Sequence, residues 1–269
     1  MVVADEIRVA VLGAAGKMGR EVLLAVSKAH DMELVGAVDR DHPGQTARDL
    51  LGAPCPKVEI CPKVGLTLDA CKPDVVVDFT HMSSAPDHAI SCLQRKIPII
   101  IGTSGLNPSD YAGIREACRE HATPAAVVPN FAVGAVLMTR FAEIAAKWFR
   151  DVEIIERHHH QKVDAPSGTA MHTAERIADA RPERPLHHEH SIEKVKGARG
   201  GIYKDIEIHS VRLPGYVASQ EVVFGSEGQL LTLRHDSIDR QCFMPGVLLA
   251  IRRIREFDKL VIGLDKMMF

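Results

Sequence analysis

Residues 7–19 read Ile-Arg-Val-Ala-Val-Leu-Gly-Ala-Ala-Gly-Lys-Met-Gly, an apolar run that leads directly into three evenly spaced glycines. The run predicts a buried strand, and the residues after it have helical periodicity. Glycines at such a junction let backbone N–H groups approach a pyrophosphate, which the positive end of the helix dipole attracts. The spacing is G-x-x-G-x-x-G rather than the commoner G-x-G-x-x-G, and the glycines could also serve strand–helix packing alone. We interpret the stretch as a dinucleotide-binding loop formed by Gly13, Ala14, Ala15, Gly16, Lys17 and Met18.

An acidic residue follows at the distance that such a loop requires. Asp39 lies 20 residues after Gly19, at the end of the second predicted strand. A carboxylate there can bind the adenosine ribose, which favours NADH. Arg40 and Lys17 carry positive charge that could instead neutralise the 2′-phosphate of NADPH. We therefore expect the chain to use either NADH or NADPH.

Apolar runs and helix-period segments alternate through the first half of the chain. Besides the first run, the predicted buried strands are Glu33–Val38, Asp74–Phe79, Ile97–Ile101 and Ala125–Val128. Buried strands separated by helices indicate an α/β fold with a Rossmann-type, doubly wound parallel sheet. One helix is expected to begin near Pro108, with Ser109 or Asp110 as its capping residue.

The pattern changes after Asn130. A long helical segment leads into strand-like residues, and further strand-like runs follow with few helices between them, at residues 152–156, 202–211, 217–225 and 230–235. These runs predict a second, α+β domain built on an open mixed sheet. Residues 181–201, rich in proline, glycine and histidine, are expected to form a long loop that moves on binding.

Two domains follow from these patterns. Residues 1–130 are assigned to a dinucleotide-binding domain that the C-terminal segment 241–269 completes, because its amphipathic helix and short apolar run could return to the first sheet. Residues 131–240 are assigned to a second domain. If cofactor and substrate bind to different domains, hinge closure is required, and we expect the bends near Asn130 and Arg240.

Composition narrows the possible partners and the compartment. The 269 residues are 46% hydrophobic and carry a formal net charge of -2 without long runs of one sign, which argues against nucleic-acid binding. Six cysteines without a C-x-x-C pair suit a reducing compartment. The sequence shows no secretory signal pattern and no apolar run near the roughly 20 residues of a membrane span. We expect a cytoplasmic protein that binds no membrane.

Residues 153–170 read Glu-Ile-Ile-Glu-Arg-His-His-His-Gln-Lys-Val-Asp-Ala-Pro-Ser-Gly-Thr-Ala and gather three histidines, a lysine and a helix start. The N–H and hydroxyl groups of Ser167, Gly168 and Thr169 predict a site for a substrate carboxylate. Lys162 can bind a carboxylate or support charge on a ring nitrogen, and a histidine can deliver a proton near neutral pH. The cluster therefore predicts reduction with proton delivery.

The histidines also allow two other interpretations, a metal site and a solvated polar loop. Successive residues on an extended strand point to opposite faces, so only His158 and His160 would share one. The sequence offers no second set of ligands with suitable spacing, and we therefore expect no metal. His187, His188 and His190, in the long loop, are expected to be surface residues.

This segment matches E-[IV]-x-E-x-H-x-x-x-K-x-D-x-P-S-G-T-A at every fixed position, and by this signature the sequence resembles the dihydrodipicolinate reductase family. The resemblance extends over nearly the whole chain. Besides the glycine loop, it includes Asp78-Phe79-Thr80, Gly102-Thr103-Ser104-Gly105, Pro129-Asn130-Phe131, residues 209–215 and Arg234-His235-Asp236-Ser237.

The resemblance implies an NAD(P)H-dependent reduction of 4-hydroxy-tetrahydrodipicolinate (dihydrodipicolinate) to tetrahydrodipicolinate in lysine and diaminopimelate biosynthesis, with hydride added at C4 and a proton at C3. His158 would be the general acid, and Lys162 would hold the substrate and support proton transfer. His159, Gly168 and Thr169 would bind the dicarboxylate. The protein would be a homotetramer formed through the sheet of the second domain, so residues 131–240 would be the substrate-binding and oligomerisation domain.

The resemblance also assigns cofactor contacts. The adenosine half would lie at Gly13 to Met18, Asp39 and Arg40. The nicotinamide half would lie near Gly102, Thr103, Ser104, Val128, Pro129, Asn130 and Phe131.

Three other functions remain open at this point. Another two-domain nicotinamide dehydrogenase would lack the pattern from Lys162 to Thr169. A non-catalytic NAD(P) sensor would need neither a proton donor nor an anion site. A zinc-dependent hydrolase would contain zinc, which elemental analysis would detect.

Overall fold

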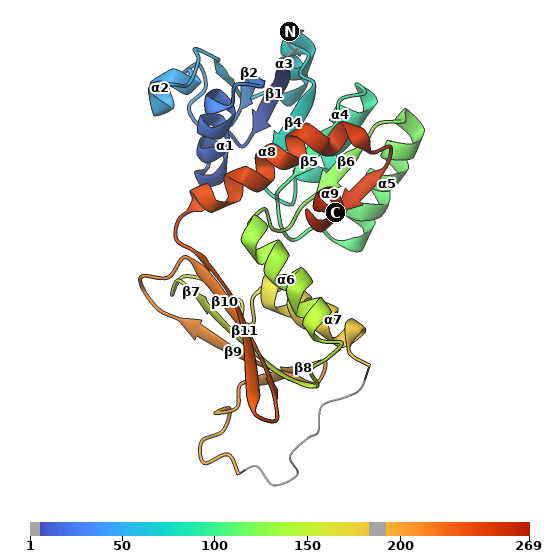
Figure 1. The fold of residues 1–269 in the computed structure, drawn as a ribbon. Coiled ribbons are helices and arrows are strands. Elements are labelled where there is room, and N and C mark those ends of the chain that lie inside the picture. The colour runs from blue at the N-terminus through green and yellow to red at the C-terminus, as the bar shows by residue number, and fades with distance from the viewer. Residues whose placement is uncertain (1–5, 183–191) are drawn as a thin grey trace. The chain divides into compact units, whose positions relative to one another are not determined.

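The chain forms two compact units, which Figure 1 shows in a computed structural model that describes residues 6–182 and 192–269. Unit 1 comprises Met1–Phe131 and Phe243–Phe269, and unit 2 comprises Ala132–Cys242. The C-terminal segment belongs to unit 1 because its strand β12 (Leu260–Ile262) pairs in parallel with β6 (Ala125–Val127). No helix within the two described ranges is long and apolar enough to cross a membrane.

In the described residues, unit 1 has a seven-stranded sheet in the order β12-β6-β5-β4-β1-β2-β3, and its strand pairs are parallel. This order is the doubly wound arrangement predicted from the alternating pattern. The other strands are β1 (Ile7–Leu12), β2 (Met32–Val38), β3 (Ile60–Cys61), β4 (Val75–Asp78) and β5 (Ile99–Ile101). The predicted α/β fold is confirmed, and the five predicted strands correspond to β1, β2, β4, β5 and β6, with small shifts at the strand ends. The short strand β3 was not predicted.

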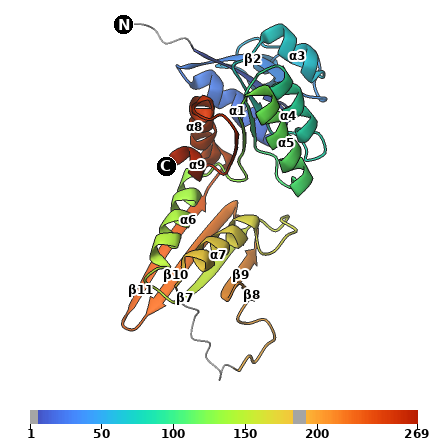
Figure 2. The same cartoon turned by 90° about the vertical axis from the view of Figure 1, so that its right-hand side faces the viewer.

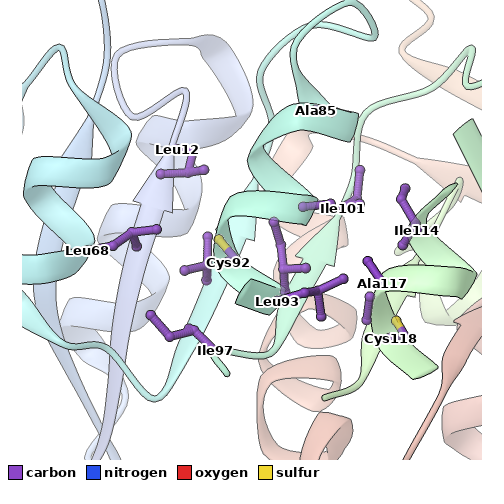
Figure 3. Close-up of a cluster of buried hydrophobic side chains, with 14 of the residues drawn as sticks. Leu12, Leu68, Ala85, Cys92, Leu93, Ile97, Ile101, Ile114, Ala117 and Cys118 are labelled. Atoms are coloured by element: carbon purple, nitrogen blue, oxygen red, sulfur yellow. The ribbon is translucent and has the colours of Figure 1, made fainter. Parts of the chain in front are cut away.

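Helices cover both faces of this sheet, with α3, α4 and α5 on one face and α1 and α8 on the other (Figure 2). The bounds are α1 (Lys17–Lys28), α2 (Ala47–Leu51), α3 (Val64–Cys71), α4 (Ala85–Gln94), α5 (Pro108–His121), α8 (Met244–Arg253) and α9 (Asp265–Met268), with a 3-10 turn at Ile254–Glu256. Figure 3 shows the apolar core under α3, α4 and α5, which includes Leu12 and Ile101. Because these two residues end β1 and β5, the core fixes the loops that follow both strands.

The cap of α5 differs from the prediction. The side chain of Asn107 accepts hydrogen bonds from the N–H groups of Ser109 and Asp110, and Asp110 accepts one from the N–H of Asn107. Ser109 or Asp110 as the capping residue was therefore wrong. Pro108 is the first helical residue, where its missing N–H costs nothing. The reciprocal hydrogen bonds between Asn107 and Asp110 make Asn107, the residue before Pro108, the cap.

Unit 2 is an open mixed sheet covered by helices α6 (Val133–Ala145) and α7 (Gly168–Ala180). In the described residues its order is β11-β10-β7-β9-β8; β7 and β9 are parallel, and the other pairs are antiparallel. The strands are β7 (Asp151–His158), β8 (Gly201–Tyr203), β9 (Ile206–Arg212), β10 (Ala218–Ser226) and β11 (Gln229–Ser237). Alternate strand residues pack with α6 and α7, as Ile154, Val222 and Phe224 do. The predicted α+β fold of this part of the chain, built on an open mixed sheet, is thereby confirmed.

One predicted strand is in fact two. Residues 202–211 were expected to form a single strand, but Lys204 and Asp205 have φ values of 52° and 59° and reverse the chain between β8 and β9. Two consecutive residues in the left-handed region form the tight turn of a hairpin. Of the expected long loop 181–201, residues 183–191, and with them His187, His188 and His190, lie outside the described residues, and residues 192–200 form turns and bends.

Candidate active site

The glycine loop of unit 1 is shaped by close backbone packing. Gly13 has a φ of 77°, and a Cβ atom on it would lie 2.7 Å from the carbonyl oxygen of Phe79. A Cβ atom on Gly19 would lie only 1.9 Å from the carbonyl oxygen of Gly13. Glycine is therefore required at both positions, so that β1, the loop and α1 can approach one another.

The start of α1 fits a phosphate group. Its N-cap residue, Gly16, has no side chain to cap the helix, and the first turn contains no acidic residue. The first-turn N–H groups therefore have no side-chain cap, and Lys17 is exposed beside them. Uncapped N–H groups at the positive end of a helix favour a bound anion, and the loop fits the pyrophosphate of a dinucleotide.

Asp39 holds the loop from the neighbouring strand. One carboxylate oxygen accepts a hydrogen bond of 2.7 Å from the N–H of Ala15, and the other accepts one of 3.0 Å from the N–H of Asp41. Each oxygen keeps a lone pair that can accept a ribose hydroxyl. Arg40 is exposed beside it. The free lone pairs of Asp39 and the neighbouring cation are the features that the sequence predicts for binding the adenosine ribose or its phosphate.

The loops after β4, β5 and β6 meet at the same edge of the sheet as the glycine loop. The rings of Phe79 and Phe131 lie 5.5 Å apart, and a Cβ atom on Gly102 would lie 2.1 Å from the ring of Phe79. The hydroxyl of Thr103 donates to the carbonyl of Thr80 at 3.3 Å. Ser104, Val128, Pro129 and Asn130 lie on the same loops. The residues expected at the nicotinamide end are thus gathered within unit 1.

A buried carboxylate, Asp78, supports this edge, and no role was predicted for it. It accepts hydrogen bonds from the N–H and hydroxyl of Thr80 at 2.7 and 2.6 Å and pairs with Nδ1 of His88 at 2.8 Å. It thereby fixes the loop that carries Phe79. The pairing joins the end of β4 to α4, and the local sequence pattern contains no signal for it.

In unit 2, His158 lies at the end of β7 against the carboxylate of Glu156. The His158 Nδ1 and Glu156 Oε2 atoms are 2.5 Å apart, and the Glu156 side chain is fully buried. Burial acts to raise the pKa of Glu156, but hydrogen bonds from His158, Arg212 and Ser210 outweigh it and lower the pKa to about 2. Glu156 is therefore ionised at neutral pH.

Lys162 lies on the turn that follows β7. Its Nζ atom donates to both carboxylate oxygens of Asp164, at 2.7 and 2.8 Å. The hydrogen bond from Lys162 holds the pKa of the Asp164 carboxyl below its usual range. Both residues are fixed positions of the signature. Because Asp164 lies two residues after Lys162, the ion pair holds the lysine within its own loop.

The start of α7 is capped by Ser167. The Ser167 hydroxyl oxygen accepts from the N–H of Ala170 at 3.2 Å, and the Ser167 N–H donates to Glu156 at 3.3 Å. In these bonds the Ser167 hydroxyl is an acceptor, so it can still donate its proton to a ligand. Gly168 is exposed at the first turn and leaves its side of the helix end open. Thr169 follows it in the same turn.

The surroundings of His159 are positively charged. Its Nδ1 atom is buried and has no hydrogen-bond partner in the described part of the chain. Loss of hydration lowers the pKa of His159, and the positive charges of His158, Arg240, His160 and Lys162 lower it further. A cluster of this sign suits a substrate with two carboxylates. Arg240 was predicted only as a hinge position, because its approach to His159 depends on the tertiary fold.

Comparisons with known proteins give one consistent result. Residues 7–131 match the family model described as dihydrodipicolinate reductase, N-terminus, and residues 134–268 match the C-terminus model. The 4-hydroxy-tetrahydrodipicolinate reductase of Desulfitobacterium hafniense is 46% identical over 97% of this chain and 98% of its own length. That of Geobacillus thermodenitrificans is 46% identical over 96% of this chain and 98% of its own.

Solved structures agree with the sequence relatives. The dipicolinate-bound dihydrodipicolinate reductase of a Paenisporosarcina species has a TM-score of 0.87 and 43% identity, covering 97% of this chain and 99% of that one. An amine dehydrogenase of Mycobacterium smegmatis, at 14% identity and a TM-score of 0.68, shares the fold alone. The match of both family models and the identity over nearly the whole length establish that this chain belongs to the dihydrodipicolinate reductase family.

Proposed function

We propose that this chain reduces 4-hydroxy-tetrahydrodipicolinate, or the dihydrodipicolinate formed from it by loss of water, to tetrahydrodipicolinate in lysine and diaminopimelate biosynthesis. The reductant is NADH or NADPH, which members of this family use. The observation that carries the proposal is the position of His158, held by a buried carboxylate within a cluster of positive charge that suits a dicarboxylate.

His158 is the proton donor in this proposal. Its Nδ1 atom faces Glu156, so Nε2, on the other side of the ring, is the atom that serves the substrate. A ring with its only proton on Nδ1 cannot donate from Nε2. The protonated ring therefore delivers the proton to C3 of the substrate and returns to the Nδ1–H form.

The two substrate carboxylates are bound by two different sets of groups. Gly168, Thr169 and the hydroxyl of Ser167 offer hydrogen bonds at the positive end of α7. Lys162 offers a cationic side chain and His159 offers its ring, and Lys162 exchanges its bond with Asp164 for one with the substrate. Binding at two places fixes the ring, so that C3 stays within reach of His158.

Unit 1 binds the cofactor through the groups described above. When bound, the reduced nicotinamide supplies the hydride that is added at C4. Gly13 to Met18 bind the pyrophosphate, and Asp39 and Arg40 bind the adenosine ribose or its phosphate. Gly102, Thr103, Ser104 and the residues Val128 to Phe131 form the nicotinamide side.

The assembly we propose is a homotetramer formed through the second sheet. On the face opposite α6 and α7, Ile155 and Val223 are only partly buried, Leu230 is exposed, and Arg157 pairs with Glu221 at 3.2 Å. Such a mixed face is suited to self-association about symmetry axes. We place the enzyme in the cytoplasm, because its six cysteines are free thiols and its reductant is a soluble cofactor.

The test is oxidation of NADH or NADPH with substrate generated from pyruvate and aspartate semialdehyde. We expect turnover by the wild type, a loss of about 100-fold or more in kcat for His158→Ala and Lys162→Ala, and retained cofactor binding in both. His172→Ala, a change of an exposed histidine on α7, is the matched control and should remain active. A folded wild-type protein that binds NADH without turnover would instead support the sensor interpretation.

A further inference from the structure

Glu156 bonds to several parts of the active site at once. Its Oε2 atom is bonded to His158 Nδ1 at 2.5 Å and to Arg212 at 2.9 Å. Its Oε1 atom accepts from Arg212 at 2.8 Å and from the Ser167 N–H at 3.3 Å. The carboxylate thus bonds to the proposed proton donor, to the start of α7 and to a partly buried arginine from β9.

The sheet register brings these groups together. In the parallel pair β7–β9, Glu156 lies opposite Ser210 and His158 lies opposite Arg212. Alternate residues of a strand share a face, so all four side chains point to the side that α7 covers. Arg212 also donates to the carbonyl of Asp164 at 2.6 Å, which ties down the loop that carries Lys162.

We propose that Glu156, held by Arg212, is the positioning residue of this active site: it fixes the proton of His158 on Nδ1 and joins the proton donor to the anion-binding end of α7. The inference rests on the proposed role of His158. A hydrogen bond to one ring nitrogen of a histidine selects the tautomer and the orientation of the ring. Together with His158, Arg212 keeps the buried carboxylate ionised, because it donates to both carboxylate oxygens.

The inference predicts which change will be harmful. In Glu156→Gln, an amide oxygen at the Oε1 position still accepts from Ser167 and Arg212. The amide nitrogen then lies at the Oε2 position, where the His158 Nδ1–H and an Arg212 N–H both point. Three donors at one place are incompatible, so His158 must move its proton to Nε2 or turn away.

We expect Glu156→Gln to lower kcat by about 100-fold or more while KM for the substrate changes little, because the contact to Ser167 survives. Glu156→Asp, which keeps the charge, should recover part of kcat. Glu153→Gln is the matched control: Glu153 lies on the same strand but faces the other way, bonded to His209 and Arg199, and its replacement should leave kcat near the wild-type value.

A measurement on the wild type does not depend on the folding of a variant. In ¹⁵N NMR of histidine-labelled protein, the His158 signals, identified by their loss in His158→Ala, should show the neutral ring protonated on Nδ1. An Nε2-protonated ring would overturn the inference, and so would wild-type kcat in folded Glu156→Gln. If His158→Ala itself retained full activity, the proposed function of that histidine would fail instead, so the two failures are distinguishable.

Discussion

Units 1 and 2 each contain a helix N-terminus to which we assign an anion site, but the two sites are built in opposite ways. The end of α1 has no side-chain cap and follows a loop whose shape depends on glycine. The end of α7 is capped by Ser167, which the buried Glu156 holds from behind. The first site is shaped by backbone packing and the second by charged side chains. Substitutions in the first site should therefore act through steric clashes. Substitutions in the second site should act through electrostatics, and their effects should depend on pH.

The largest effect is expected from Gly19→Ala. The new methyl group would lie 1.9 Å from the Gly13 carbonyl oxygen, so the loop must open. We expect NADH affinity to fall by about 100-fold or more, which corresponds to about 3 kcal/mol, as measured by fluorescence titration. Gly113→Ala in α5, where a methyl group meets nothing within 4 Å, is the control and should gain roughly 0.5–1 kcal/mol of stability. Unchanged NADH affinity in Gly19→Ala would contradict the steric account.

Acid should weaken the second site through Glu156. Its pKa is lowered from 4.5 to about 2 in the folded chain, so its contribution to stability is complete above pH 4.5 and is lost as the pH falls toward 2. A shift of this size corresponds to roughly 3 kcal/mol. The wild type should therefore exceed Glu156→Gln in free energy of unfolding above pH 4.5, and denaturant titrations should show the difference shrinking below it. A difference in free energy of unfolding that does not vary with pH would contradict a stabilising role of the ionised Glu156 carboxylate.

A smaller effect is expected from removing the cap of α7. Ser167→Ala should lower the free energy of unfolding by about 1 kcal/mol and raise the substrate KM, because the helix end and its hydroxyl donor are both affected. Thr46→Ala removes the cap of α2 in unit 1 and is the matched control. It should cost similar stability and leave KM unchanged. Equal KM values in the two variants would show that Ser167 is only a structural cap.

The smallest effect concerns protons taken up on binding. Loss of hydration and positive neighbours lower the pKa of His159, and a bound dianion should raise it again. Calorimetry with dipicolinate in two buffers of different ionisation enthalpy should therefore detect uptake of a fraction of a proton near neutral pH. The uptake should be smaller in His159→Asn. If both proteins took up the same amount, the titrating group would be elsewhere.

The difference between the units also explains what the sequence could predict. The glycine loop and Asp39 are local features with fixed spacing, and their positions follow from a strand, a turn and a helix. The residues that we expect at the nicotinamide end could be predicted only from the family resemblance, since they come from separate loops that meet only when the sheet is formed. The bonds of Glu156 to Arg212 depend on the register of β7 and β9, which no local pattern specifies. The turn at Lys204 was missed because polar residues within an alternating run still resemble a strand.

The central claim is that this chain transfers a hydride to C4 of the cyclic substrate while His158 supplies the proton. The most direct test uses a reduced nicotinamide carrying deuterium at the transferable position, with product analysis by NMR. The account predicts tetrahydrodipicolinate with deuterium at C4, formed at least about 100-fold more slowly by His158→Ala. Deuterium at another carbon, or equally fast formation by His158→Ala, would contradict it.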